Sequence, residues 1–166
     1  MTTLSIQELT SAAFAPFGRV IEQPARPVDA IGPGWQYWGE MLTLHGGDRP
    51  YALGYLHLQP AELRFDWAER HMLSDELLAP LGGDCLVYVA PADHPDQPEH
   101  MPDLGRFQVF RVRSGQAVIL QPGVWHGAPL AIDQALNVLV LLLQNSGQQD
   151  VFLNRFEDQP VVIHTT

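Results

Sequence analysis

Cationic side chains and cysteines are scarce in this chain. Its 166 residues carry 9 Lys and Arg against 19 Asp and Glu, which gives a formal net charge of −10. This balance argues against nucleic acid or an anionic membrane surface as the main partner, although a local arginine or metal could still hold an anionic substrate. Cys85 is the only cysteine, so no intramolecular disulfide can form, and a reduced, cytoplasmic setting is expected.

Several other features that would point to a function are missing. The N-terminus lacks the basic region and apolar run of a signal peptide, and no apolar run approaches the roughly 20 residues that a membrane helix needs. The sequence contains no glycine-rich phosphate loop, nucleophile elbow or paired-cysteine zinc motif. We therefore expect neither a membrane partner, nor covalent catalysis, nor an organic cofactor.

Proline and glycine are abundant, with 14 of each spread along the chain. They separate short apolar runs, and this pattern is typical of an all-β sandwich or barrel. No linker or internal repeat divides the sequence, and its length suits one domain with a real core. We therefore predict one mainly β domain over residues 1–166. Closure into an antiparallel barrel would protect the edges of so many short strands.

The prolines and glycines also predict where individual helices and strands begin and end. Ser5 to Ala15 is expected to form one short helix, with Ser5 and Glu8 as a capping box. The predicted strands cover residues 19–22, 37–44, 53–58, 65–71, 85–90, 107–112, 116–120, 137–144, 151–156 and 161–164.

One set of acidic and imidazole side chains has the spacing expected of a ligand pocket. Glu69 and His71 are two residues apart, so a strand places both on one face. A turn after His71 would return Glu76 to the same pocket, and a Pro-Gly turn delivers His126 from another strand. Two imidazoles with one or two carboxylates suit nickel, zinc, iron or manganese, and open coordination positions would admit a substrate.

These motifs resemble those of known proteins. Glu-x-His-x4-Glu followed by Pro-Gly-x2-His is similar to the two-part metal signature of the cupin superfamily, which normally has His at the position of Glu69. Nearly the whole chain resembles the ureidoglycolate lyase family within that superfamily. The segments that carry this resemblance are residues 14–22, 69–71, 80–83, 87–91, 123–126 and 129–130.

The resemblance implies a fold, an activity and a metal. The implied fold is a cupin-like antiparallel β-barrel of the jelly-roll type with a short N-terminal helix. The implied protein is a homodimeric, cytoplasmic enzyme of allantoin and purine breakdown that splits ureidoglycolate, a small carboxylic acid, into glyoxylate and urea. Nickel is the metal associated with the family, in a structural or a catalytic role.

Several positions depart from the family pattern. The family often has Tyr-His before the Pro-Gly turn and a second His after Trp-His, where this chain has Leu120, Gln121 and Gly127. Family members commonly carry Gln in place of Glu76 and a basic residue in place of His57. Part of the polar lining is thus changed while a carboxylate is gained, which favours metal binding and leaves the substrate open.

Cleavage of ureidoglycolate needs a base, an acid and a group that holds the substrate carboxylate. We predict catalytic roles for Glu69, His71 and His126, with Glu69 or Glu76 as the base. The predicted metal ligands are His71, Glu76 and His126. The predicted substrate-binding residues are Arg70, Gln121, Trp125 and His57.

Three alternatives stay open at this point. The chain could be a cupin isomerase, dioxygenase or lyase that acts on another small hydroxy or keto acid. It could also bind a small ligand without turning it over. In the third case the barrel holds no metal, and each of these side chains is a solvated or hydrogen-bonded structural residue.

Overall fold

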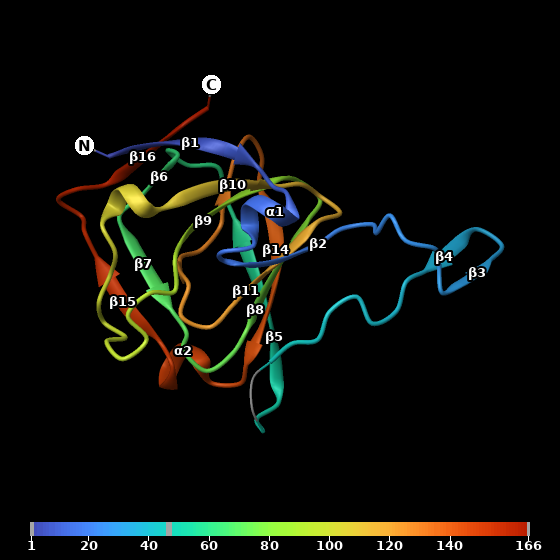
Figure 1. Ribbon diagram of the computed structural model, residues 1–166. Helices are drawn as coiled ribbons and strands as arrows, with labels where there is room; N and C mark the ends of the chain where they lie inside the picture. Colours follow the sequence, from blue (N-terminus) through green and yellow to red (C-terminus); the bar gives the residue numbers. More distant parts are fainter. Residues whose placement is uncertain (1, 46–47, 166) are drawn as a thin grey trace.

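Two sheets curve around a shared interior in the computed structural model, which describes residues 2–45 and 48–165 (Figure 1). The larger sheet has the strand order β15-β7-β12-β9-β10-β1-β16-β6, with β13 paired to β9, and the smaller one has the order β2-β11-β8-β14-β5. This arrangement confirms the predicted mainly β fold, with its sheets curled into a barrel. No helix in the described ranges is long and apolar enough to cross a membrane.

The strands of the larger sheet are β1 (Thr3–Glu8), β6 (Arg64–Phe65), β7 (Trp67–Arg70), β9 (Cys85–Ala90), β10 (Gln108–Val112), β12 (Trp125–His126), β13 (Leu130–Ala131), β15 (Phe152–Arg155) and β16 (Val161–His164). Those of the smaller sheet are β2 (Gly18–Ile21), β5 (Tyr51–Leu58), β8 (Glu76–Leu81), β11 (Ala117–Leu120) and β14 (Leu136–Leu143). The short helices are α1 (Ser11–Phe14), a 3-10 turn (Leu104–Arg106) and α2 (Ser146–Gln149).

The N-terminal helix is shorter and begins later than the sequence predicts. The capping box assigned to Ser5 and Glu8 is wrong, because both residues belong to β1, which pairs in parallel with β10 and with β16. Leu4 and Ile6 of this strand pack against a buried apolar cluster, and that tertiary contact outweighs the local helical signal. The helix begins at Ser11 and is capped by Thr10, whose hydroxyl accepts the backbone amide of Ala13 at 3.1 Å.

Residues 22–44 leave the barrel as a projecting segment, which we call the arm (Figure 1). The strand predicted over residues 37–44 is wrong. Instead, β3 (Ala30–Gly32) and β4 (Trp35–Tyr37) form a hairpin at the tip of the arm, and among the described strands each pairs only with the other.

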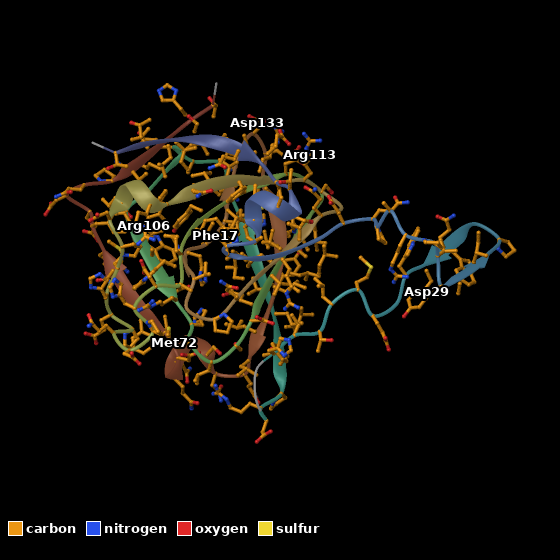
Figure 2. All side chains as sticks on the ribbon, in the orientation of Figure 1. Phe17, Asp29, Met72, Arg106, Arg113 and Asp133 are labelled. Carbon is orange, nitrogen blue, oxygen red and sulfur yellow. The ribbon has the colours of Figure 1, made fainter. Side chains whose placement is uncertain are left out.

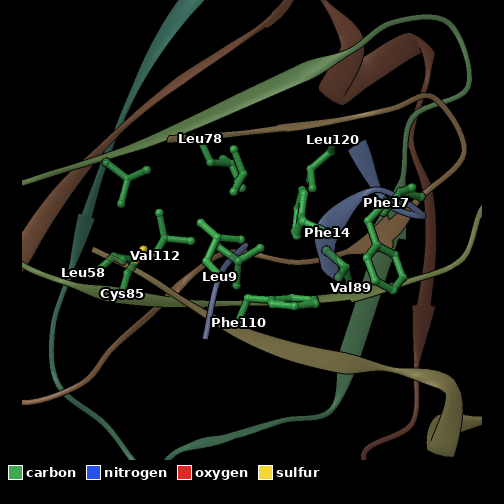
Figure 3. Packing of buried hydrophobic residues seen from close by; sticks show 14 of the residues in the cluster. Leu9, Phe14, Phe17, Leu58, Leu78, Cys85, Val89, Phe110, Val112 and Leu120 are labelled. Atoms are coloured by element: carbon green, nitrogen blue, oxygen red, sulfur yellow. The ribbon is translucent and has the colours of Figure 1, made fainter. Parts of the chain in front are cut away.

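The interior is filled mainly by aliphatic and phenylalanine side chains (Figure 3). Phe14 packs edge-on against Phe110, with their ring centroids 5.2 Å apart. The central strand β9 is buried on both faces. Cys85, Val87 and Val89 face the interior, while Leu86, Tyr88 and Ala90 face a second apolar cluster that also holds side chains of β1 and β16. Burial raises the pKa of the Cys85 thiol to about 12, so this cysteine acts as a small hydrophobic residue.

Candidate metal centre

Four predicted site residues meet in one pocket of the barrel: Glu69, His71, Glu76 and His126. Glu69 of β7 lies directly opposite His126 of β12, and His71 follows β7 on the same face as Glu69. The Oε2 atom of Glu76, at the start of β8, lies 3.0 Å from His126 Nε2 and 3.5 Å from His71 Nε2. Strands distant in sequence therefore bring together the two imidazoles and two carboxylates that the sequence singles out.

Backbone contacts orient both imidazole rings toward the pocket. His71 Nδ1 lies 2.5 Å from the carbonyl oxygen of Asp150, and His126 Nδ1 lies 2.9 Å from that of Val124. A carbonyl only accepts hydrogen bonds, so each Nδ1 must donate its hydrogen. In the neutral rings, Nε2 then presents a lone pair to the pocket, as metal-binding histidines do.

The chemistry of this set fits a divalent metal. One donor atom each from Glu69, His71 and His126 lies within 4.8 Å of the other two. His126 Nε2 and Glu76 Oε2 are buried, and neither has a well-directed hydrogen-bond partner in the described parts of the chain. Unpaired buried polar atoms are costly, and an ion bound between them would satisfy both. The structure thus provides a His/Glu cluster that could bind a metal.

Glu76 and His126 are electrostatically coupled. Burial raises the pKa of Glu76, but the attraction of the two imidazoles outweighs it, so the pKa of this carboxyl is lowered. Burial lowers the pKa of His126, but the neighbouring Glu76 carboxylate reverses this effect and the pKa is raised. A proton on His126 would compete with a metal for Nε2.

The pocket is small and mostly apolar apart from this cluster. Its volume is about 260 Å³, and the four aliphatic side chains on its wall come from β5, β8 and β14: Leu56, Leu78, Val140 and Leu142. The remaining wall consists of residues 127–129 and Gly147. This volume suits a ligand of only a few heavy atoms.

The four predicted substrate-binding residues are not brought to this pocket. Arg70 alternates with Glu69 and His71, so it is buried on the opposite face of β7. Its guanidinium donates hydrogen bonds to backbone carbonyls of residues 93, 94, 97, 98 and 123, and it stacks over the Trp125 ring, 4.8 Å from the ring centroid. Trp125 is itself fully buried, with Nε1 donating to the His100 carbonyl at 3.2 Å.

Gln121 and His57 lie on the surface. Gln121 is exposed and donates from its amide to the carbonyl of Pro16 at 2.9 Å. His57 is exposed on the outer side of β5, where it contacts the Asn137 side chain at 2.8 Å. None of the pocket-lining residues hydrogen-bonds to either side chain in the described chain.

One positioning residue escapes sequence reasoning. Asp150, directly after α2, accepts the backbone amides of Met72 and Leu73 at 2.9 Å each, while its carbonyl oxygen contacts His71. It therefore fixes the segment that carries a candidate ligand (Met72 is labelled in Figure 2). The only sequence signal was an acidic residue at the end of the polar run 144–150.

Comparison with known proteins identifies the family. The family model described as ureidoglycolate lyase matches residues 1–164. The chain belongs to the ureidoglycolate lyase family. A ureidoglycolate lyase of Azotobacter vinelandii is 31% identical over 172 residues, and the match covers 99% of each chain. One from Pseudomonas aeruginosa PAO1 is 33% identical over 153 residues, covering 89% of this chain and 87% of the other.

The ureidoglycolate lyases are enzymes, so the predicted family and enzyme class are confirmed. A dTDP sugar isomerase from Desulfovibrio desulfuricans G20 is 17% identical, with a TM-score of 0.45 over 91% of this chain and 82% of the isomerase. That likeness is too distant to bear on function.

Gly127 is one of the positions at which this chain departs from the family pattern, and its surroundings give a local structural reason. A Cβ atom at Gly127 would overlap the hydroxyl of Tyr88. That hydroxyl donates to the Trp67 carbonyl at 3.1 Å, so the tyrosine is held in place. A glycine at position 127 and a tyrosine at position 88 are therefore sterically coupled, and a second histidine after His126 would not fit without a shift of this ring.

Proposed function

We propose that this protein is a ureidoglycolate lyase, which cleaves ureidoglycolate to glyoxylate and urea in allantoin and purine breakdown. Its family membership supports the activity. The observation that carries the proposal is the Glu76 carboxylate held between the Nε2 atoms of His71 and His126 in a pocket of about 260 Å³. Such a pocket suits a small hydroxy acid that needs polar groups at one end.

A divalent metal is part of this proposal, with nickel favoured by the family resemblance. His71, His126 and Glu76 would hold it, with Glu69 close enough to serve as an additional or alternative ligand. When bound, such an ion supplies Lewis acidity and positive charge for a substrate oxygen.

The distribution of cations supports a need for that positive charge. The chain contains no lysine, and none of its nine arginines lines the pocket. Seven of the arginines form ion pairs with nearby carboxylates, and Arg49 and Arg70 bind an amide and carbonyl oxygens elsewhere. Within the described residues, no guanidinium is therefore available to receive a substrate carboxylate in the pocket.

The two carboxylates of the pocket, Glu69 and Glu76, have different roles in the proposed reaction. Removal of the hydroxyl proton of ureidoglycolate lets the carbonyl form as the carbon–nitrogen bond breaks, and the departing urea nitrogen takes up a proton. Glu76 contacts both imidazoles and has a lowered pKa, so it is a weak base. We assign the base to Glu69, which lies half-buried at the pocket opposite His126. Protonated Glu69 can then return this proton to the departing nitrogen, while His126 would hold the ion that stabilises the developing charge.

We further propose that residues 1–166 form a single domain that acts in the cytoplasm as a homodimer. The acidic net charge supports a small-molecule substrate rather than nucleic acid or a membrane surface. The exposed apolar surfaces described below support self-association. The mostly apolar pocket wall also leaves room for a second candidate substrate, another small hydroxy or keto acid.

The test measures glyoxylate release from racemic ureidoglycolate by nickel-supplemented protein, against the spontaneous decay. We expect Glu69→Gln and His126→Ala each to lower kcat/KM by about a hundredfold, the usual scale for loss of an acid–base group. His57→Ala, on the outer surface, is the matched control and should retain the activity. Wild-type rates in both pocket variants would refute the assigned roles. No release by folded wild-type protein would favour the second candidate substrate or ligand binding alone.

A further inference from the structure

The arm is ordered by its own hydrogen bonds. Arg26 pairs with Asp29 at 2.7 Å, Asp29 accepts the Gly39 amide at 2.8 Å, and Trp38 Nε1 donates to the Arg26 carbonyl at 3.0 Å. No hydrogen bond joins residues 23–42 to the barrel in the described chain. Figure 2 labels Asp29 on this arm, well away from the barrel. The arm is thus ordered by its own contacts, and within the described residues only its two ends, at Glu22 and Thr43, hydrogen-bond to the barrel.

The tip of the arm presents apolar side chains to solvent. Ile31 is 66% exposed, Trp35 is 54% exposed and Tyr37 is 57% exposed. We call these three residues the arm tip. A lone two-stranded hairpin is marginally stable in water, and a cluster of exposed large apolar groups marks an interaction surface.

A second open apolar surface lies on the outer side of the smaller sheet. Leu53 is 68% exposed, Tyr55 is 66% exposed and Leu81 is 41% exposed. Leu53 and Tyr55 lie beside Leu141 and Leu139 of β14, so the apolar surface continues across the strands. The opposite side of these strands lines the pocket. We call Leu53, Tyr55 and Leu81 the open sheet face.

We propose that the arm tip of one copy docks on the open sheet face of a second copy, and that the contact is repeated about a two-fold axis. The arm extends away from its own barrel, and both surfaces occur on the same chain, so a reciprocal exchange covers both in each copy (Figure 1). The arm tip carries no charge, and the nearby charges of Arg26 and Asp29 cancel in their ion pair, which suits apolar contact with this acidic protein.

The area available is sufficient for such a dimer. Each of the six side chains exposes on the order of 100 Å², so two copies would bury about 1,200 Å². That value lies at the lower end of stable, specific interfaces. The inference rests on the proposed homodimer and specifies the surfaces that form it.

Sedimentation velocity over a range of concentrations tests this contact. The arm variant is Trp35→Ser with Tyr37→Ser, and the sheet variant is Leu53→Ser with Tyr55→Ser. We expect the wild type to be dimeric and each variant alone to be monomeric at concentrations where the wild type is more than nine-tenths dimer. Leu153→Ser, which removes a side chain that is 46% exposed on β15, is the control and should stay dimeric.

Mixing the two variants gives the decisive result. Only a mixed pair retains one intact contact, so the mixture should form dimers that dissociate at least tenfold more readily than the wild type. A dimeric arm variant, a dimeric sheet variant, a monomeric wild type or a mixture that stays monomeric would each overturn the proposal. If a double variant fails to fold by circular dichroism, Trp35→Ser and Tyr55→Ser alone replace the pair. Lyase activity is assayed separately, so its presence in a protein that lacks this contact would leave the proposed function standing.

Discussion

Arg70→Lys tests how strongly one buried side chain holds the region beside the pocket. The Arg70 guanidinium donates to five backbone carbonyls, of which those of residues 93, 97 and 98 lie within 2.8 Å and the other two at 3.3 and 3.4 Å. All but one of these carbonyls belong to the proline-rich loop between β9 and β10. The guanidinium also stacks on Trp125. A lysine ammonium has three donors and no planar face, so it cannot replace this set.

The expected loss is about 3 kcal/mol of the free energy of unfolding. Hydrogen bonds to a charged donor contribute about 1.5–3 kcal/mol each, and a buried cation–π contact contributes up to about 2 kcal/mol. Lysine could keep the better part of the three short bonds but would lose the two longer ones and the stacking. The contributions of the two lost hydrogen bonds and the lost stacking are not additive, so we take about half of their sum as the expected loss.

Urea unfolding at neutral pH measures this loss, and hydrogen exchange of residues 91–102 shows where it occurs. We expect faster exchange throughout that loop in Arg70→Lys. Arg111→Lys is the matched control, because Arg111 makes one ion pair with Asp84 at 2.9 Å on a partly exposed side chain and should change stability by less than about 1 kcal/mol. An unfolding free energy within about 0.5 kcal/mol of the wild type, with unchanged exchange, would refute the reasoning.

Three further perturbations test other parts of the structure. Gly127→Ala should lower stability by about 1–3 kcal/mol in urea unfolding, because its Cβ meets the Tyr88 hydroxyl, and a wild-type midpoint would show that the ring moves freely. The amide of Ser114 is the main cause of the lowered pKa of Asp84, so this carboxylate stabilises the fold above its unfolded pKa and that stability is lost as the pH falls through the folded pKa. Asp84→Asn should therefore flatten the acidic side of a plot of melting temperature against pH, and an unchanged plot would contradict the assignment. The pKa of His126 is raised, so nickel binding measured by calorimetry should weaken as the pH falls through this raised pKa, and pH-independent binding would exclude this ligand.

The sequence predicts the site better than it predicts the segments around it. The two-residue spacing of Glu69 and His71 is enough to place both on one face of a strand, and the Pro-Gly turn places His126 opposite them. The same alternation places Arg70 on the opposite face of β7, so the substrate contact predicted for it conflicts with the period of the strand. His57 alternates with Leu56 and Leu58, and Gln121 precedes a turn, but only the fold shows which side of each segment faces the pocket.

The fold was predictable where apolar runs are bounded by breakers, as at β9, β14 and β16. The fold was not predictable where pairing between strands that are distant in the sequence determines the structure. Ser5 and Glu8 satisfy a helix-start pattern, yet β1 forms because two distant strands flank it. Residues 38–44 contain apolar side chains without a neighbouring strand to pair with. The Asp150 carboxylate accepts hydrogen bonds from backbone amides nearly 80 residues away in the sequence, and no local sequence pattern indicates such a contact.

The parallel pairing of β1 with β16 has a consequence for folding. Residues 3–5 bind residues 162–164, from the other end of the sequence, and residues 6–8 bind β10. During synthesis, β1 must therefore wait until residues 161–164 have left the ribosome before its second edge is covered. Contacts of such high sequence separation slow folding and leave an open strand edge exposed in the meantime. A nascent chain stalled shortly before residue 161 should therefore engage chaperones more strongly than the released protein.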